Sequence, residues 1–178
     1  MRFRGAVPRR ASGKGIETRI AALTEALPSL QWHWDAETDI LGGSFRLPAS
    51  IAGLTGSVEL TDQDGAIVVL DVSGGAIRGL DVVVWPPVEG APSLIAPPGV
   101  RDGVLMLGAK ASEAAISALE LDTPLRVEAD ARESVFHLRI GERPASEVVR
   151  LADRLLAELD GRRRLAGFWL LDVPPFPA

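Results

Sequence analysis

Short segments in which apolar and polar residues alternate recur along this chain, and turn-forming residues separate them. The alternation runs through Leu30–Trp34, Leu41–Leu47 and Val58–Thr61. A period of two is typical of half-buried β-strands. The segments Ala66–Val72 and Ile77–Trp85 are more continuously apolar, which predicts strands nearer the centre of a sheet. Together these segments predict an antiparallel meander of four or five strands.

A stretch rich in proline and glycine, residues 86–103, interrupts this pattern. Beyond it, Leu125–Ala129 and Val135–Ile140 alternate again and predict a second hairpin. The apolar segment Leu165–Leu171 predicts a buried strand close to the end of the chain.

Two segments carry a helical spacing of apolar residues instead. Ile16–Leu27 has apolar residues at i, i+4, i+7 and i+11, and Pro28 follows it. Pro144–Leu159 begins with a proline, which suits the first position of a helix. Residues 112–119 favour a third, short helix. The predicted fold class is therefore α+β, an antiparallel β-meander packed by an N-terminal helix and a long helix in the C-terminal half.

The chain of 178 residues suits one domain. Residues 1–15 carry five positive charges and no acidic residue, which predicts a flexible basic arm. Residues 16–178 predict a single α+β domain, with an alternative of two sub-lobes (16–88 and 104–178) joined by the crossover 86–103. The predicted order of elements over residues 16–160 resembles that of type III secretion chaperones, which implies an acidic protein that binds another protein.

Two apolar segments echo each other, Leu80–Val88 and Leu171–Phe176. Each contains Leu-Asp-Val and runs into two consecutive prolines. Proline ends strands because it has no N–H to donate to the ladder. We interpret the echo as two strand ends of the same kind, and the chain shows no helical or propeller repeat.

Charge is distributed unevenly along the chain, which has 19 basic and 24 acidic residues and a net charge of −5 at pH 7. Outside residues 1–15 and the run Arg162–Arg164, 11 basic residues stand against 24 acidic ones, a net charge of −13. Such a body repels phosphate backbones and anionic lipids. Nucleic acid could bind only through the basic arm, and the expected partner is another protein with a basic or extended surface.

The chain has no cysteine, which excludes disulfides, thiol nucleophiles and cysteine-based metal sites. Its two histidines are far apart in sequence, so we expect neither a metal ion nor a cofactor. Because no apolar window is long enough for a membrane span and no secretory signal is recognisable, we expect a cytoplasmic protein. Abundant Ala, Gly, Arg and Pro indicate a GC-rich, bacterial genome.

The candidate site residues lie on and around the predicted meander. Trp32, Trp34 and Trp85 belong either to the core or to a ligand cleft or partner surface, because tryptophan is enriched in both binding hot spots and apolar pockets. His33 and Asp35 stand on the polar phase of the same strand, where a histidine beside a carboxylate could act as a general base. No Gly-x-Ser-x-Gly elbow or phosphate-binding loop is present, so we assign no catalytic residue.

The run Arg162, Arg163 and Arg164 follows the second predicted helix. There cations would offset the negative end of the helix dipole, and an anion-binding site is the alternative.

Three functions are compatible with these patterns. The first is a non-catalytic, acidic protein-binding module of the adaptor, chaperone or immunity type. The second is a small-ligand-binding or hydrolytic domain with a cleft between sheet and helix, in which His33, Trp34 and Asp35 would act. The third is a structural assembly component held by the basic arm and residues 172–178. Association of the chain with copies of itself stays open in all three.

Overall fold

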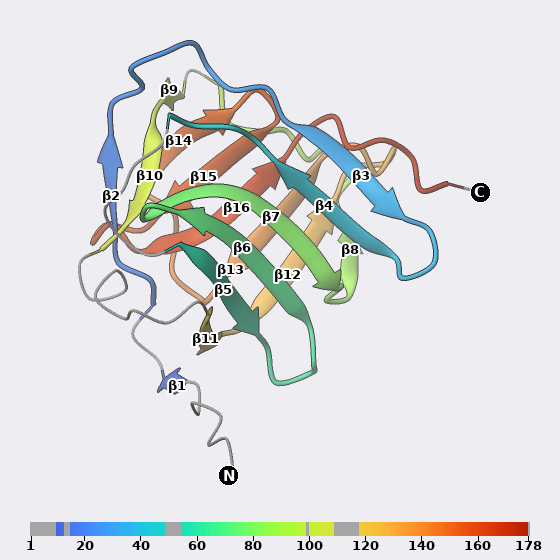
Figure 1. Cartoon of the computed structure of the whole chain (residues 1–178). Coiled ribbons are helices and arrows are strands. Elements are labelled where there is room, and N and C mark those ends of the chain that lie inside the picture. The colour runs from blue at the N-terminus through green and yellow to red at the C-terminus, as the bar shows by residue number, and fades with distance from the viewer. Residues whose placement is uncertain (1–9, 13–14, 49–54, 99, 109–117, 178) are drawn as a thin grey trace, which may run out of the picture.

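The computed structural model describes residues 10–12, 15–48, 55–98, 100–108 and 118–177, and these ranges contain strands and turns but no helix. Two sheets face each other, with β5, β6 and β7 in front of β12, β13 and β16 in Figure 1. The architecture is all-β, so the predicted α+β fold class is wrong. None of the described residues forms a helix that could cross a membrane.

The first sheet has nine strands, ordered β1-β11-β5-β6-β7-β10-β2, with β4 and then β3 also extending from β7. Its strands are β1 (Arg10–Ser12), β2 (Thr18–Ala21), β3 (Gln31–Asp35), β4 (Ile40–Ser44), β5 (Gly56–Thr61), β6 (Ile67–Ser73), β7 (Ala76–Val84), β10 (Val104–Leu107) and β11 (Ala118–Asp122). The second sheet has seven strands, ordered β8-β12-β13-β16-β15-β14-β9. Its strands are β8 (Val88–Gly90), β9 (Arg101–Asp102), β12 (Leu125–Ala129), β13 (Phe136–Ile140), β14 (Glu147–Ala152), β15 (Leu155–Leu159) and β16 (Leu165–Leu170).

The two sheets contain the same five-stranded unit. In the first repeat the strands β3–β7 lie in the order β3-β4-β7-β6-β5, and in the second repeat β12–β16 lie in the order β12-β13-β16-β15-β14. All neighbours within each repeat are antiparallel. The register of the opening hairpins is also the same, because Trp34 pairs with Leu41 and, 95 positions later, Ala129 pairs with Phe136.

A glycine occupies the same position in both repeats. Gly79 pairs with Ser44 and Gly167 pairs with Arg139. A Cβ at either glycine would press on the backbone of the neighbouring strand, at 2.8 Å from Gly43 O in the first repeat and 2.5 Å from Leu138 O in the second. The lack of a side chain therefore lets these strands approach closely.

Two consecutive prolines follow the last strand of each repeat, Pro86–Pro87 after β7 and Pro174–Pro175 after β16. With the two glycines aligned, these prolines fall at equivalent positions. The echo seen in the sequence thus belongs to a structural repeat, and our interpretation of it as strand ends alone was incomplete. The Leu-Asp-Val triplets themselves are out of register.

In each repeat, an aspartate side chain accepts a hydrogen bond from the backbone at the start of the other repeat. Leu30 N, before β3, donates to Asp153 Oδ1 at 2.8 Å, and Asp153 lies in the turn after β14. Reciprocally, Leu125 N, at the start of β12, donates to Asp62 Oδ2 at 3.2 Å, and Asp62 lies in the turn after β5. Asp62 of the first repeat therefore holds the start of the second repeat in the same way as Asp153 of the second repeat holds the start of the first.

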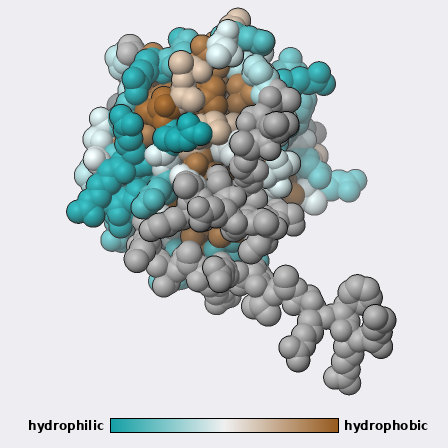
Figure 2. Space-filling model, turned by 60° about the vertical axis from the view of Figure 1, so that its left-hand side comes forward, coloured by the Kyte–Doolittle hydropathy of each residue, from teal (hydrophilic) through white to brown (hydrophobic). Residues whose placement is uncertain are grey.

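The core lies between the sheets and is built from the inward phase of the strands. Its largest fully buried side chains include Leu41, Leu60, Leu80, Leu138 and Phe168. On the side where β2, β9 and β10 lie, apolar side chains show at the surface among hydrophilic ones (Figure 2). Residues 91–100 join the two edge strands β8 and β9 of the second sheet, and Pro97 and Pro98 line a hollow together with the outward-facing Leu156.

The long helix predicted over Pro144–Leu159 is replaced by β14 and β15. Their connecting turn contains Asp153 and Arg154, and all five residues of β15 are buried. Leu155 and Leu159 are four residues apart, an even spacing that also keeps them on one face of a strand. The apolar spacing was therefore compatible with either structure, and burial on both faces of β15 removed the alternation that marks a strand.

The N-terminal helix predicted over Ile16–Leu27 is also absent. Thr18–Ala21 form β2, and a loop continues to Leu30. Most of the third predicted helix, residues 112–117, and of the predicted arm, residues 1–9, 13 and 14, lies outside the described residues. Without the helices, the resemblance to type III secretion chaperones has no structural basis.

Candidate functional site

A cleft lined by four aromatic rings lies where the ends of the two repeats meet. We call it the aromatic cleft, and it has a volume of about 490 Å³. It is lined by Trp34, Asp39, Trp85, Val88, Arg132, Glu133, Phe136, Pro175 and Phe176. The first repeat and its following segment supply Trp34, Trp85 and Val88, while the second supplies Phe136 and Phe176, so neither repeat forms the cleft alone.

The aromatic rings contact one another in a chain. Trp34 and Trp85 stack with ring centroids 5.6 Å apart, and Trp34 meets Phe176 edge to face at 5.2 Å. Trp85 lies 5.2 Å from Phe136, whose ring is buried. Such pairs stabilise an aromatic cluster beyond the burial of area alone.

The polar atoms of both tryptophans are already satisfied by backbone oxygens. Trp34 Nε1 donates to Pro174 O at 2.8 Å, and Trp85 Nε1 donates to Asp39 O at 3.0 Å. The first bond fixes the C-terminal segment against β3, and the second fixes the β3–β4 turn against the end of β7. The cleft therefore offers preorganised apolar ring surface.

Apolar side chains remain exposed at this cleft. Phe176 is 46% exposed and Val88 is 44% exposed, and both line it. Patches of exposed apolar surface with a polar rim mark binding sites in soluble proteins. The rim here consists of two carboxylates, Asp39 and Glu133, and the guanidinium of Arg132.

The structure brings together only two of the five residues that the sequence singled out on the meander. Trp34 and Trp85 line the aromatic cleft, but Trp32 is buried in the core, where Nε1 donates to Leu171 O at 3.0 Å. His33 is exposed on the outer face of the first sheet. The Thr38 hydroxyl and the Glu37 amide bond to Asp35 and lower the pKa of its carboxyl, so Asp35 stabilises the turn.

The sequence patterns did not reveal the partners of these tryptophans. The alternation of Phe136 indicated only a buried strand residue, and Phe176 stands in a proline-rich tail without periodicity. The proline echo was the signal that could have pointed to Phe176, because Phe176 follows the second pair of prolines at the position that Val88 has after the first.

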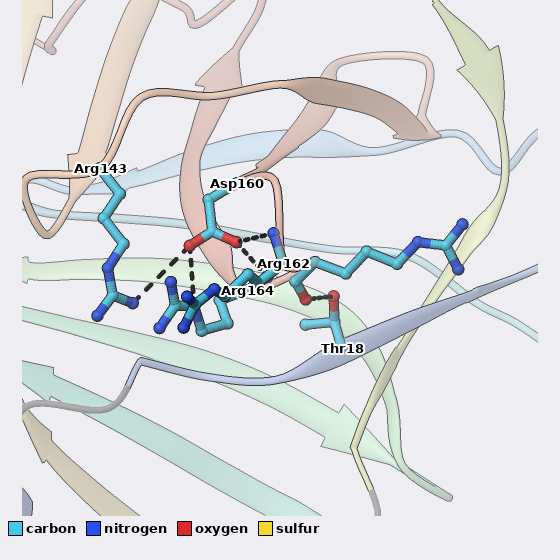
Figure 3. Close-up of polar contacts among 6 residues, drawn as sticks. Thr18, Arg143, Asp160, Arg162 and Arg164 are labelled. Carbon is cyan, nitrogen blue, oxygen red and sulfur yellow. Dashed lines mark hydrogen bonds and ion pairs between the residues drawn. The ribbon is translucent and has the colours of Figure 1, made fainter.

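The arginine run lies in the turn between β15 and β16, so it does not follow a helix. Asp160 accepts hydrogen bonds from the backbone N–H groups of Arg162 and Arg164 and from Arg164 Nε, all between 2.8 and 2.9 Å. Arg143 Nη1 lies 3.8 Å from the same carboxylate, which is at the centre of the contacts in Figure 3. Burial raises the pKa of Asp160, but these bonds outweigh it and the net pKa is lowered.

Two of the three arginines of this run lie near a carboxylate. Arg164 is bound to Asp160, and Arg163 Nε lies 3.9 Å from Glu147. Arg163 O accepts bonds from both the backbone N–H and the hydroxyl of Thr18, which ties the turn to β2. This arrangement favours a structural role for the run over anion binding.

The second histidine lies in a filled polar cluster on the outer face of the second sheet. His137 Nε2 is 2.8 Å from Glu158 Oε2, and its Nδ1 is 3.3 Å from Glu128 Oε2. The imidazole stacks on Trp169 at 4.0 Å, and Trp169 Nε1 donates to Glu158 Oε1 at 2.7 Å. With both ring nitrogens facing carboxylates, His137 has no nitrogen directed at open space for a substrate.

Within the described ranges, no group of three or more His, Asp and Glu side chains could hold a metal ion. The sequence matches no model of a known protein family and no curated protein.

Proposed function

We propose that the protein is a non-catalytic binding module that takes an apolar or aromatic side chain of a partner protein into the aromatic cleft. The proposal rests on the positions of the exposed large apolar side chains. Among the described residues, four large apolar side chains are exposed: Val88 and Phe176 line the cleft, while Val84 and Ile95 do not line it.

Charge favours a partner segment with basic residues beside its apolar anchor. Two carboxylates and one guanidinium surround the cleft, and the chain outside the basic arm and the arginine run carries the net charge of −13. Complementary charge speeds association and excludes acidic competitors. A lysine or arginine next to an aromatic residue is the simplest such segment.

A free small ligand is the second candidate, because the volume of about 490 Å³ lies in the range of small-molecule sites. The hydrolytic version of this candidate has no support in the geometry. His33 and Trp34 lie on opposite faces of β3, and Asp35 is engaged in its own turn.

The direct test is calorimetric titration of the full chain with the peptide acetyl-Lys-Trp-Lys-amide. The proposal predicts binding that is lost with acetyl-Lys-Ala-Lys-amide and weakened with acetyl-Glu-Trp-Glu-amide. The variant Phe176→Asp should weaken binding at least about fivefold, since it puts a charge where an apolar anchor packs. Free N-acetyl-tryptophanamide distinguishes the second candidate, which predicts that it binds as tightly as the peptide.

The matched control is Ile95→Asp, which removes an exposed apolar side chain of similar size away from the cleft. It should bind the tryptophan peptide as the wild type does. Equal loss in both variants, or equal binding of the tryptophan and alanine peptides, would overturn the proposal.

A further inference from the structure

A second hollow lies on the outer face of the first sheet and shares no lining residue with the aromatic cleft. We call it the polar groove, and its volume is about 1030 Å³. Gly42 and Ser44 line it from β4, and His33 and Gln31 line it from β3. Its remaining polar lining includes Ser57, Asp71, Asp81, Arg46 and Arg78.

The second repeat shows what fills the same place there. By register, Gly42 corresponds to His137, because Gly42 pairs with His33 and Asp81, while His137 pairs with Glu128 and Trp169. Asp81 therefore stands in the position of Trp169. The imidazole and the indole that pack together in the second repeat are both missing from the first.

The carboxylate that binds these rings is nevertheless retained. Glu158 pairs with Gly167, and Asp71 pairs with Gly79, the glycine at the equivalent position of the first repeat. In the second repeat Glu158 contacts His137 Nε2 and accepts the indole N–H of Trp169. In the first repeat this acceptor position is kept, whereas the nitrogen-bearing rings that would satisfy it have been replaced by a glycine and a second carboxylate.

Three polar groups of the groove have no side-chain hydrogen-bond partner among the described residues. Asp71 and Asp81 are exposed to solvent, and no side chain among the described residues donates a hydrogen bond to either. Arg78 Nε is buried without any hydrogen-bond partner there. Partial burial, together with repulsion from Asp71, raises the pKa of Asp81. Asp81 Oδ1 leans over Gly42, where a Cβ would come within 2.5 Å of it.

We propose that the polar groove binds an arginine residue of a partner, with its planar guanidinium between Asp71 and Asp81 in the place that the rings occupy in the second repeat. A guanidinium supplies several N–H donors in one plane, which suits two carboxylates. The carbonyl oxygen of the same arginine would offer an acceptor to the groove's own guanidiniums. The guanidiniums of Arg46 and Arg78 and the imidazole of His33 also face the groove, so a bare cation without an acceptor fits less well.

The test is a titration of the full chain with acetyl-Gly-Arg-Gly-amide, followed by amide NMR shifts of Gly42 and Gly79. The matched ligand carries citrulline, which has the same shape without the charge. We expect the arginine peptide to bind at least fivefold more tightly than the citrulline peptide. The double variant Asp71→Asn with Asp81→Asn should abolish this preference, whereas the exposed-turn control Asp64→Asn should keep it.

The variant Gly42→His provides an independent test, because it restores the ring found in the second repeat and should block the peptide. The Cβ of the new residue would meet only the flexible end of Asp81. Equal binding of the two peptides to the wild type, a preference that survives the double asparagine variant, or shifts confined to the aromatic cleft would each overturn the proposal. The proposal for the aromatic cleft is tested separately, with lysine peptides and different variants.

Discussion

Truncation of Glu158 should be among the most costly single substitutions in the second repeat. This glutamate is 7% exposed and serves two nitrogen groups at once, Trp169 Nε1 at 2.7 Å and His137 Nε2 at 2.8 Å. Glu158→Ala leaves both without their partner in a buried setting, which costs about 3–5 kcal/mol. Glu158→Gln keeps the shape and an acceptor for the indole but loses the charge, which costs about 1.5–3 kcal/mol.

Urea unfolding followed by circular dichroism and by tryptophan fluorescence measures both losses as shifts of the midpoint. The matched control is Glu128→Gln, which contacts the same imidazole at 3.3 Å but has a side chain 34% exposed to solvent. It should cost no more than about 1 kcal/mol. A loss below about 1 kcal/mol for Glu158→Ala, or equal losses for the two glutamine variants, would refute this account of the cluster.

Three further predictions concern stability. Gly167→Ala should lower the free energy of unfolding by about 1–3 kcal/mol, because its Cβ would stand 2.5 Å from a backbone oxygen. The control Gly90→Ala has open space around it and should be neutral within about 0.5 kcal/mol, so equal urea midpoints for the two variants would contradict this prediction. Asp153→Ala and Asp62→Ala should each cost about 1–3 kcal/mol and speed amide exchange at the first strand of the other repeat, an effect that exchange mass spectrometry would detect or disprove. Burial raises the pKa of Glu158, but the bonds from its two nitrogen partners outweigh this effect and the net pKa is lowered. Its contribution to stability is therefore full above the unfolded-state pKa of about 4.3 and is lost as the pH falls through the lower folded-state pKa. A stability advantage of the wild type over Glu158→Gln that did not shrink in acid would be inconsistent with this sign.

The sequence located the individual strands far better than it located the fold class. Leu125–Ala129 and Val135–Ile140 were predicted as a hairpin and form β12 and β13. Where one face of a strand is polar, the period of two is visible. In β15 both faces are covered, so that signal is lost and the four-residue spacing of its leucines fits a helix equally well.

The candidate site was partly accessible from sequence for a similar reason. Trp34 and Trp85 were identified by residue type, but their distance from Phe136 and Phe176 depends on how the two repeats meet, which local patterns do not encode. The repeat itself is visible only after the register of the strands is known. Few side chains are identical between equivalent positions, and the glycine and the paired prolines are the main traces left in the sequence.

The most direct test of the binding proposal is an NMR titration of the four tryptophan indole N–H signals, using chain labelled with ¹⁵N. The ligand is unlabelled acetyl-Lys-Trp-Lys-amide, and Trp→Phe variants assign each signal. The account predicts that the Trp34 and Trp85 signals move on titration while those of the buried Trp32 and Trp169 stay in place. Signals that all remain unchanged, or movement restricted to the two buried tryptophans, would contradict it.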